Sequence, residues 1–296
     1  MNHAEHALLF DCASQPTVGI LSLPAAQRPT LGLLVIVGGP QYRIGSHRQF
    51  VLMARHVAAQ GFAAMRFDCR GMGDSWDAQR SFEDIEDDIA SAVGSFFREV
   101  PSLERVILWG LCDGASAACL YAPRDPRIGG LILVNPWVHT PAGASATMLK
   151  HYYLKRLVSR AFWLKLASGR VSASASMSAF SDTLRQYLGR RSTGAKPADD
   201  TDSSTPLPQR MARRLRASGL PVAVALSEDD RVAREFEELA MPTPAWQAVL
   251  SKQLVGLEHV ADADHTLANP ASQARLQVLT TGWMRAMIQR SVRTVA

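Results

Sequence analysis

The feature that most constrains the fold of this chain is a strand-to-helix turn around Cys112. An apolar run ending at Trp109 meets Gly-Leu-Cys-Asp-Gly at residues 110–114, and an alanine-rich segment of helical character follows. Glycines at this spacing let a strand and a helix approach closely around one strained, exposed side chain, which is the form of a nucleophile elbow. The sequence therefore predicts a thiol at the tip of a turn. A buried, inert cysteine is the alternative.

Short apolar runs alternate with amphipathic segments along most of the chain. Two early runs, residues 7–10 and 17–23, predict an antiparallel lead-in. The later pattern predicts strands at residues 31–37, 62–67, 106–109, 130–134, 220–226 and 253–257, and helices at 47–60, 82–97, 232–239 and 273–290. Strands that alternate with helices indicate parallel crossovers. We expect an α/β fold with a mostly parallel sheet and helices on both faces.

The alternation stops between residues 139 and 216. This segment has no strand pattern, contains a basic helical stretch at 148–166, and includes a Gly/Pro/Ser/Asp-rich stretch near 190–209 that predicts a mobile loop. Insertions between two sheet strands are often active-site lids. We expect residues 1–138 and 217–296 to form the core and residues 139–216 to form a helical cap.

The predicted cap also carries most of the positive charge. It has 14 Lys/Arg and 4 Asp, a balance of +10, whereas the rest of the chain sums to −5. A solvated surface gives such a pattern, and so does a cover for an anionic small-molecule substrate or a peripheral contact with a membrane surface. No nucleic-acid-binding motif is present, so we expect no nucleic-acid partner.

Composition indicates a globular protein of the cytoplasm. Hydrophobic residues make up 47% and charged residues 20% of the 296 residues, and no signal-like start or membrane-spanning apolar run occurs. The four cysteines lack CxxC pairs and disulfide-scaffold density, which favours reduced thiols. Cysteine and histidine show no metal-ligand spacing, so we expect neither a metal nor a cofactor.

An acid and a histidine follow the elbow in the order that a nucleophile of this kind requires. In α/β-hydrolases the nucleophile, the acid and the histidine come in that chain order, each from a loop at the carboxyl end of a strand. Glu228, Asp229 and Asp230 follow the strand at 220–226. Asp230 fits best because a short helix opens directly after it, and Asp229 is second. The sequence therefore predicts an α/β-hydrolase fold.

Among eight histidines, His265 is the preferred base. It lies in a polar turn between the last predicted strand and the closing helix, whereas the alternative, His259, lies closer to that strand. An imidazole beside Cys112 would favour a thiolate–imidazolium pair. At the entrance of the predicted cap, His139 is a candidate substrate-binding residue.

A developing oxyanion needs backbone donors. The N–H of Asp113, the residue after the predicted nucleophile, is one candidate. The second must come from the Gly-Gly-Pro-Gln loop at residues 38–41, in which proline has no N–H. Gly39 is preferred and Gln41 is the alternative. Tyr42 and Arg43, which follow this loop, are further substrate-binding candidates.

The sequence Asp-Cys-Arg-Gly-Met-Gly-Asp-Ser at residues 68–75 contains two glycines but no P-loop Lys-Ser/Thr. In hydrolases such a run after the fourth strand is common and structural. We interpret it as a feature of the fold and not as a phosphate site.

Several motifs together resemble one branch of the α/β-hydrolases, the exosortase A system-associated hydrolase 1 family. They are Val37–Arg43, Phe67–Asp74, Trp109–Asp113, Val134–Trp137, His151–Leu154, Ala233–Phe236 and Ala263–Thr266. The resemblance implies a bacterial cysteine hydrolase of unassigned substrate, linked to exopolysaccharide and exosortase systems. Where members often read Ser-Gly-Asn-Asp, this chain has Ser-Glu-Asp-Asp at 227–230, and Asp230 still aligns.

These features predict an enzyme that cleaves an ester or thioester through a covalent acyl-cysteine intermediate. An acyltransferase would use the same intermediate, because a thioester is open to capture by amines and thiols. A non-catalytic binding protein on a hydrolase scaffold is the third hypothesis. The acyl group, the acceptor and the oligomeric state do not follow from the sequence.

Overall fold

The computed structural model describes residues 3–25, 28–39, 41–138 and 205–295. The chain divides into two compact units, one of residues 1–138 and 208–296 and one of residues 139–207. The basic helical stretch and the polar loop predicted within 139–204 lie outside the described residues. The predicted division into core and cap therefore stays a prediction.

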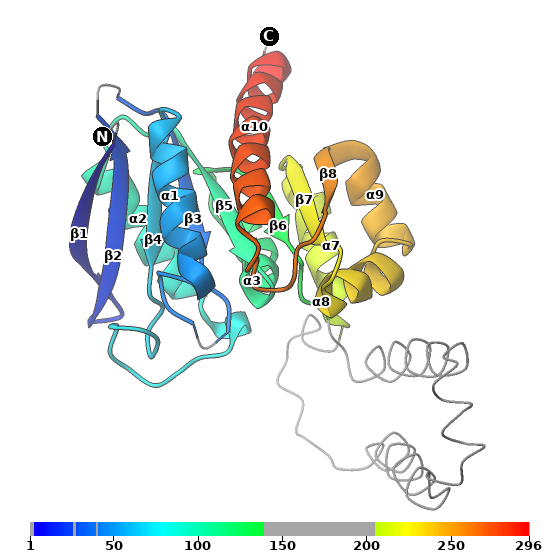
Figure 1. Ribbon diagram of the computed structural model, residues 1–296, viewed down its shortest axis with the longest axis horizontal. Helices are drawn as coiled ribbons and strands as arrows, with labels where there is room; N and C mark the ends of the chain where they lie inside the picture. The colour runs from blue at the N-terminus through cyan, green and yellow to red at the C-terminus, as the bar shows by residue number, and fades with distance from the viewer. Residues whose placement is uncertain (1–2, 26–27, 40, 139–204, 296) are drawn as a thin grey trace, which may run out of the picture. The chain divides into compact units, whose positions relative to one another are not determined.

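An eight-stranded sheet is the centre of the first unit (Figure 1). Its strand order is β1-β2-β4-β3-β5-β6-β7-β8. The strands are β1 His3–Cys12, β2 Gln15–Pro24, β3 Leu31–Ile36, β4 Ala63–Phe67, β5 Arg105–Leu111, β6 Ile128–Val134, β7 Val222–Ser227 and β8 Leu254–Val260. β1 and β2 form an antiparallel hairpin, β2 pairs antiparallel with β4, and the pairs from β4 to β8 are parallel. The predicted lead-in and mostly parallel sheet are confirmed.

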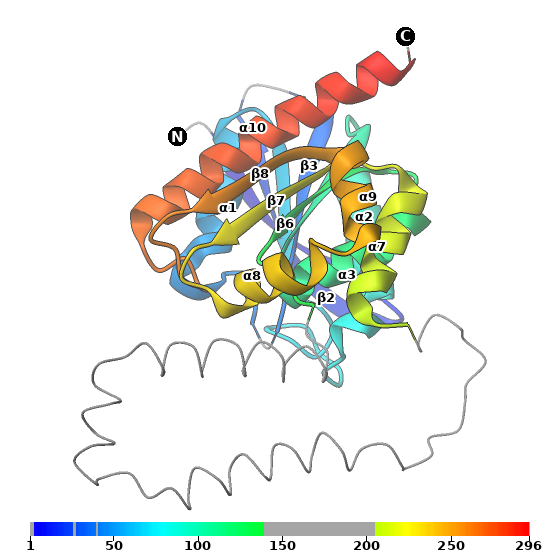
Figure 2. The same ribbon diagram turned by 90° about the vertical axis from the view of Figure 1, so that its right-hand side faces the viewer.

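Helices cover both faces of this sheet (Figures 1 and 2). They are α1 Gln49–Ala59, α2 Glu86–Glu99, α3 Asp113–Tyr121, α7 Leu207–Ser218, α8 Arg231–Glu235, α9 Pro244–Gln253 and α10 Pro270–Val295. Short helical turns are η1 Ser46–Arg48, η2 Phe82–Asp84, η3 Ala122–Arg124 and the π-helical η4 Phe236–Ala240. Side chains of α1 and α10 form one core with alternate residues of the strands.

On the opposite face, α2 packs through apolar residues at helical spacing. Ile89, Val93 and Phe96 are fully buried and recur at i, i+4 and i+7. Phe96 lies against β3 so closely that a Cβ at Gly32 would come within 2.7 Å of its ring. α3 lies on the same face as α2 (Figure 2). This layer brings the N-terminus of α3, and with it Cys112, to the carboxyl end of the sheet.

Two helices differ from the sequence-based expectation. α9 was not predicted, although Thr243 caps its N-terminus by accepting the N–H of Trp246 and Pro244 follows the cap. α7 includes residues 207–216, which the prediction gave to the cap. Its Arg214 donates to the Leu120 carbonyl at 2.9 Å, a contact with the end of α3.

The run at residues 68–75 forms a structural turn, as predicted, and its two ends are buried. The Asp68 carboxylate is fully buried and accepts the N–H groups of Arg43 and Asp74 at 2.7 and 3.0 Å. Ser75 donates to the Asp68 carbonyl at 3.0 Å and accepts the Val18 N–H at 3.0 Å. The turn thus ties β2 and the β3–α1 loop to the end of β4. No helix in the described part of the chain is long and apolar enough to cross a membrane.

Candidate active site

Cys112 lies at the tip of a strained turn between β5 and α3. Its backbone angles are φ 58° and ψ −124°, outside the regions that non-glycine residues favour. A Cβ at Gly110 or at Gly114 would come within 2.5 Å of backbone atoms, so both positions require glycine. Strain of this kind costs on the order of 1–3 kcal/mol and persists where surrounding contacts hold it. Here the Cys112 N–H donates to the Val134 carbonyl at 2.9 Å. The predicted strand–turn–helix is therefore present.

The four cysteines differ in their environments. Cys12, Cys69 and Cys119 are buried, whereas Cys112 is partly exposed. Burial raises the pKa of each of the three buried thiols, most strongly for Cys69 and Cys119. Such thiols resist ionisation and are inert. The accessible thiol is the one at the elbow.

Asp230 is the carboxylate that contacts His265. Its Oδ2 lies 2.7 Å from His265 Nδ1, while its Oδ1 accepts the Val232 N–H at 3.0 Å and caps α8. Asp230 is buried, whereas the other two candidates, Glu228 and Asp229, are exposed. The structure thus brings together the preferred acid and the preferred histidine.

Backbone contacts hold the two loops that carry this pair. The Asn135 side chain, at the end of β6, accepts the Ser227 N–H at 2.8 Å and donates to the Ser227 hydroxyl at 3.0 Å. The Asp229 N–H donates to the Ala263 carbonyl at 2.9 Å, which joins the acid loop to the histidine loop. In the latter, Asp264 accepts the N–H groups of Thr266 and Ala268, each at 3.0 Å. These hydrogen bonds therefore fix the backbone that carries Asp230 and His265.

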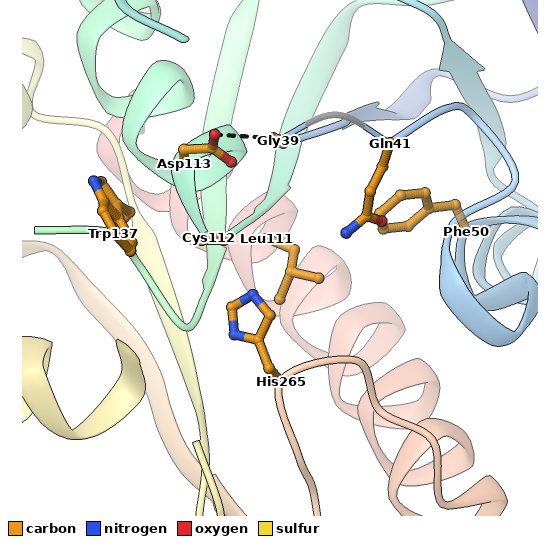
Figure 3. Close-up of a pocket in the computed structure, with 9 residues that line it drawn as sticks. Gly39, Gln41, Phe50, Leu111, Cys112, Asp113, Trp137 and His265 are labelled. Atoms are coloured by element: carbon orange, nitrogen blue, oxygen red, sulfur yellow. Dashed lines mark hydrogen bonds between the residues drawn. The ribbon is translucent and has the colours of Figure 1, made fainter. Parts of the chain in front are cut away.

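The other histidine candidate has a different partner. His259 lies on β8, is exposed, and its Nε2 contacts Glu237 Oε1 at 2.9 Å. His265 lies in the turn after β8, and its ring points toward the elbow (Figure 3). The Asp230 carboxylate first and the Cys112 side chain second raise its pKa to about 10. The imidazole is therefore protonated at neutral pH.

The elbow opens into a cavity of about 230 Å³ (Figure 3). Its lining residues are Gly38, Gly39, Gln41, Phe50, Leu111, Cys112, Asp113, Trp137 and His265. Sequence reasoning missed the apolar wall of Phe50, Leu111 and Trp137 as part of a site. Trp137 follows the carboxyl end of β6, and the rule that sites gather at these ends could have indicated it. The volume of this cavity lies just below the range of most ligand pockets.

The predicted oxyanion donors surround Cys112, but one of them already has an acceptor. Gly39 N–H donates to Asp113 Oδ2 at 2.9 Å. Burial raises the pKa of the Asp113 carboxyl, and the N–H groups of Gly39 and Gly114 oppose that shift. Gln41 lines the cavity, and its Oε1 is buried without a partner among the described residues. The assignment of the oxyanion donors stays a prediction.

Tyr42 and Arg43 are not among the residues that line this cavity. The Arg43 guanidinium contacts the buried Asp68 carboxylate and also Asp74, at 2.6 Å, and lies 5.7 Å from the centre of the Tyr42 ring. A buried carboxylate requires such a cation, which gives Arg43 a structural role. Tyr42 is 40% exposed. His139 lies outside the described residues. Within the described ranges, no group of three or more His, Cys, Asp or Glu side chains could hold a metal ion.

The stability of the fold is expected to depend on pH through His265. Its folded pKa of about 10 exceeds the ordinary value of 6.5, so the folded state binds this proton more tightly than the unfolded state does. The resulting stabilisation is fully present below pH 6.5 and is lost as the pH rises through 10. Urea unfolding between these limits should show a steeper decline for the parent protein than for His265→Gln. His259→Gln is the control and should keep the parent slope. Equal slopes for the parent and His265→Gln would contradict this assignment.

A family model described as Hydrolase_4, "Serine aminopeptidase, S33", matches residues 30–241. The chain belongs to this α/β-hydrolase family. The match spans β3 to η4, and so includes the elbow and Asp230, while His265 lies beyond its end. No curated protein matches this hydrolase in sequence.

Solved structures with the same fold are distant in sequence from this hydrolase. The Pyrococcus furiosus esterase Pf2001 is 12% identical, with a TM-score of 0.62 over 96% of this chain and 91% of that one. Est1E from Butyrivibrio proteoclasticus, solved with ferulic acid bound, is 15% identical, with a TM-score of 0.58 over 96% and 100%. The dienelactone hydrolase of Anabaena variabilis is 12% identical, with a TM-score of 0.58 over 96% and 98%. At these identities the likeness establishes the fold.

Proposed function

We propose that this hydrolase cleaves an ester or thioester with Cys112 as its nucleophile. The observation that carries the proposal is that the His265 ring, which lies 2.7 Å from Asp230, lines the same cavity as Cys112. A thiol needs less activation than a hydroxyl, and a neighbouring cation favours its thiolate form. The protonated His265 is such a cation.

The geometry supports a two-step reaction in which protons balance. Cys112 Sγ, as thiolate, attacks the acyl carbon, and backbone N–H groups hold the carbonyl oxygen as it becomes negative. Collapse of this intermediate breaks the bond to the leaving group, which takes the proton from His265 Nε2. Neutral His265 then removes a proton from water, and the hydroxide attacks the acyl-cysteine. Release of the acid restores thiolate and imidazolium, while Asp230 holds the ring through Nδ1.

The cavity and the similar proteins favour a small acyl group on oxygen or sulfur. Phe50, Leu111 and Trp137 give the cavity an apolar wall. One similar structure is named as an esterase and another as a dienelactone hydrolase. The family description names a serine aminopeptidase, whereas this chain has cysteine at the elbow. An ester or thioester has a better leaving group than an amide, so we place peptides second.

The wider setting of this reaction is proposed from sequence alone. The motifs that resemble the exosortase A system-associated hydrolase 1 family favour a role beside bacterial exopolysaccharide production, in the cytoplasm. The +10 balance of residues 139–216 suits a cap that meets an anionic acyl carrier or a membrane surface. Transfer to an amine, alcohol or thiol acceptor is the alternative fate of the acyl-cysteine.

Intact mass spectrometry tests the proposal directly. The protein is mixed with acyl thioesters and activated esters of increasing chain length and quenched in acid. The parent protein should gain the mass of one acyl group, and the adduct should decay in water. Cys112→Ala should gain none, while Cys119→Ala, which alters a buried thiol nearby, should behave as the parent. Turnover by Cys112→Ala, or an adduct on that variant, would show that another group is the nucleophile. Faster decay with an added acceptor would indicate transfer.

A further inference from the structure

The side chain of Asp113 is built into the loop that faces Cys112. Its Oδ2 accepts the Gly39 N–H at 2.9 Å, and a Cβ at Gly38 would come within 2.0 Å of its Oδ1. The Asp113 carboxylate therefore packs directly against the backbone of Gly38 and Gly39. Any side chain larger than that of glycine at position 38 would occupy the space of this carboxylate. Figure 3 shows this hydrogen bond beside the elbow.

This placement is unfavourable for stability taken by itself. Asp113 Oδ1 is buried without a partner among the described residues, and burial raises the pKa of the carboxyl. A buried acceptor that lacks a hydrogen bond costs free energy. A negative charge beside Cys112 would also oppose the negative charge that develops on a bound carbonyl oxygen. An advantage other than stability is needed to explain an aspartate at this position.

Control of which N–H groups face the reacting carbonyl would compensate this loss of stability. Gly39 N–H is directed to Asp113 Oδ2 and cannot serve an oxyanion in this arrangement. Gln41, two residues further on the same loop, lines the cavity, and its N–H has no acceptor among the described residues. When the Gly39 N–H donates to Asp113, the Gln41 N–H is therefore still available to bind an oxyanion.

We propose that Asp113 is a positioning residue whose carboxylate, by accepting the Gly39 N–H, holds the 38–41 loop so that Gln41 N–H joins Asp113 N–H in the oxyanion hole. This inference rests on the proposed function, since it concerns the same acyl transfer to Cys112. In this proposal the backbone N–H of Asp113 binds the oxyanion, and the side chain of Asp113 holds the loop in place.

Steady-state kinetics of three variants test this role. Asp113→Asn keeps an oxygen that accepts the Gly39 N–H, whereas Asp113→Ala and Asp113→Leu do not. Loss of one oxyanion donor lowers kcat by roughly 10²- to 10³-fold, so we expect such a loss for the Ala and Leu variants with little change in KM. Asp113→Asn should restore kcat to within about tenfold of the parent. Thermal unfolding of each variant identifies any that does not fold, and Leu replaces Ala if Ala fails.

Alkylation of Cys112 by iodoacetamide separates this inference from the proposed function. Alkylation forms no oxyanion, and alanine and asparagine both remove the carboxylate charge beside Cys112, so its rate should be equal in Asp113→Ala and Asp113→Asn. Parent-like kcat in the Ala and Leu variants, or an equal loss in Asp113→Asn, would overturn the role of Asp113 while acylation of the parent still supports the nucleophile. If the parent forms no acyl adduct at Cys112, the proposed function itself fails.

Discussion

Replacement of Cys112 by alanine is expected to lower turnover of an activated ester or thioester on the order of 10⁴- to 10⁶-fold, as loss of a catalytic nucleophile does in other hydrolases. The cavity, the Asp230–His265 pair and the backbone donors remain, so binding should persist while the covalent step is lost. Initial rates against substrate concentration should show the loss in kcat. Cys119→Ala is the matched control and should retain parent rates.

Cys112→Ser extends the same test to the protonation state of His265. A serine hydroxyl requires a neutral imidazole as base, whereas Asp230, the first cause of the raised pKa of His265, is still present in this variant. The serine variant should therefore be weakly active at pH 7 and gain activity as the pH rises. Parent-like activity of Cys112→Ser at pH 7, or of Cys112→Ala at any pH, would contradict a thiolate mechanism.

The sheet and the elbow could be predicted because their sequence signals are local. Buried parallel strands require continuous apolar runs, and the glycines at 110 and 114 leave few conformations other than a tight strand-to-helix turn. α9 escaped prediction because its apolar residues do not form a clear stripe. Its start signal, Thr243 followed by Pro244, was present in the sequence.

The order of residues along the chain limited the candidate site to a few residues. The contacts in the structure were needed to choose among these candidates. All three acid candidates, Glu228, Asp229 and Asp230, carry a carboxylate. The turn directs only the carboxylate of Asp230 toward His265. The partner of Gly39 could not be foreseen, because it is a side chain 74 positions away. For the same reason the sequence could not show that Arg43, a candidate substrate contact, compensates the buried Asp68.

Asp88→Ala is expected to cause a large loss of stability. Asp88 is fully buried and accepts three hydrogen bonds from Arg70: from its N–H at 2.8 Å, from Nε at 3.1 Å and from Nη2 at 2.9 Å. Arg70 itself is 2% exposed, so removal of the carboxylate leaves a buried guanidinium without its hydrogen-bonded partner. Breaking a buried pair in this way costs about 3–5 kcal/mol, which corresponds to a fall in Tm of roughly 6–15 °C.

Asp87 provides the matched control for this prediction. It also faces Arg70, at 3.9 Å, but its side chain is 81% exposed, and exposed ion pairs contribute about 1 kcal/mol or less. Asp87→Ala should therefore unfold at nearly the parent urea concentration. The double variant Asp88→Ala/Arg70→Met also removes the buried guanidinium charge, so it should recover part of the lost stability. Equal destabilisation by Asp87→Ala and Asp88→Ala would show that burial of the Asp88 pair does not determine the effect. Because Arg70 lies in the same turn as Asp68, loss of the pair should also loosen the β3–α1 loop, and hence lower turnover before the sheet unfolds.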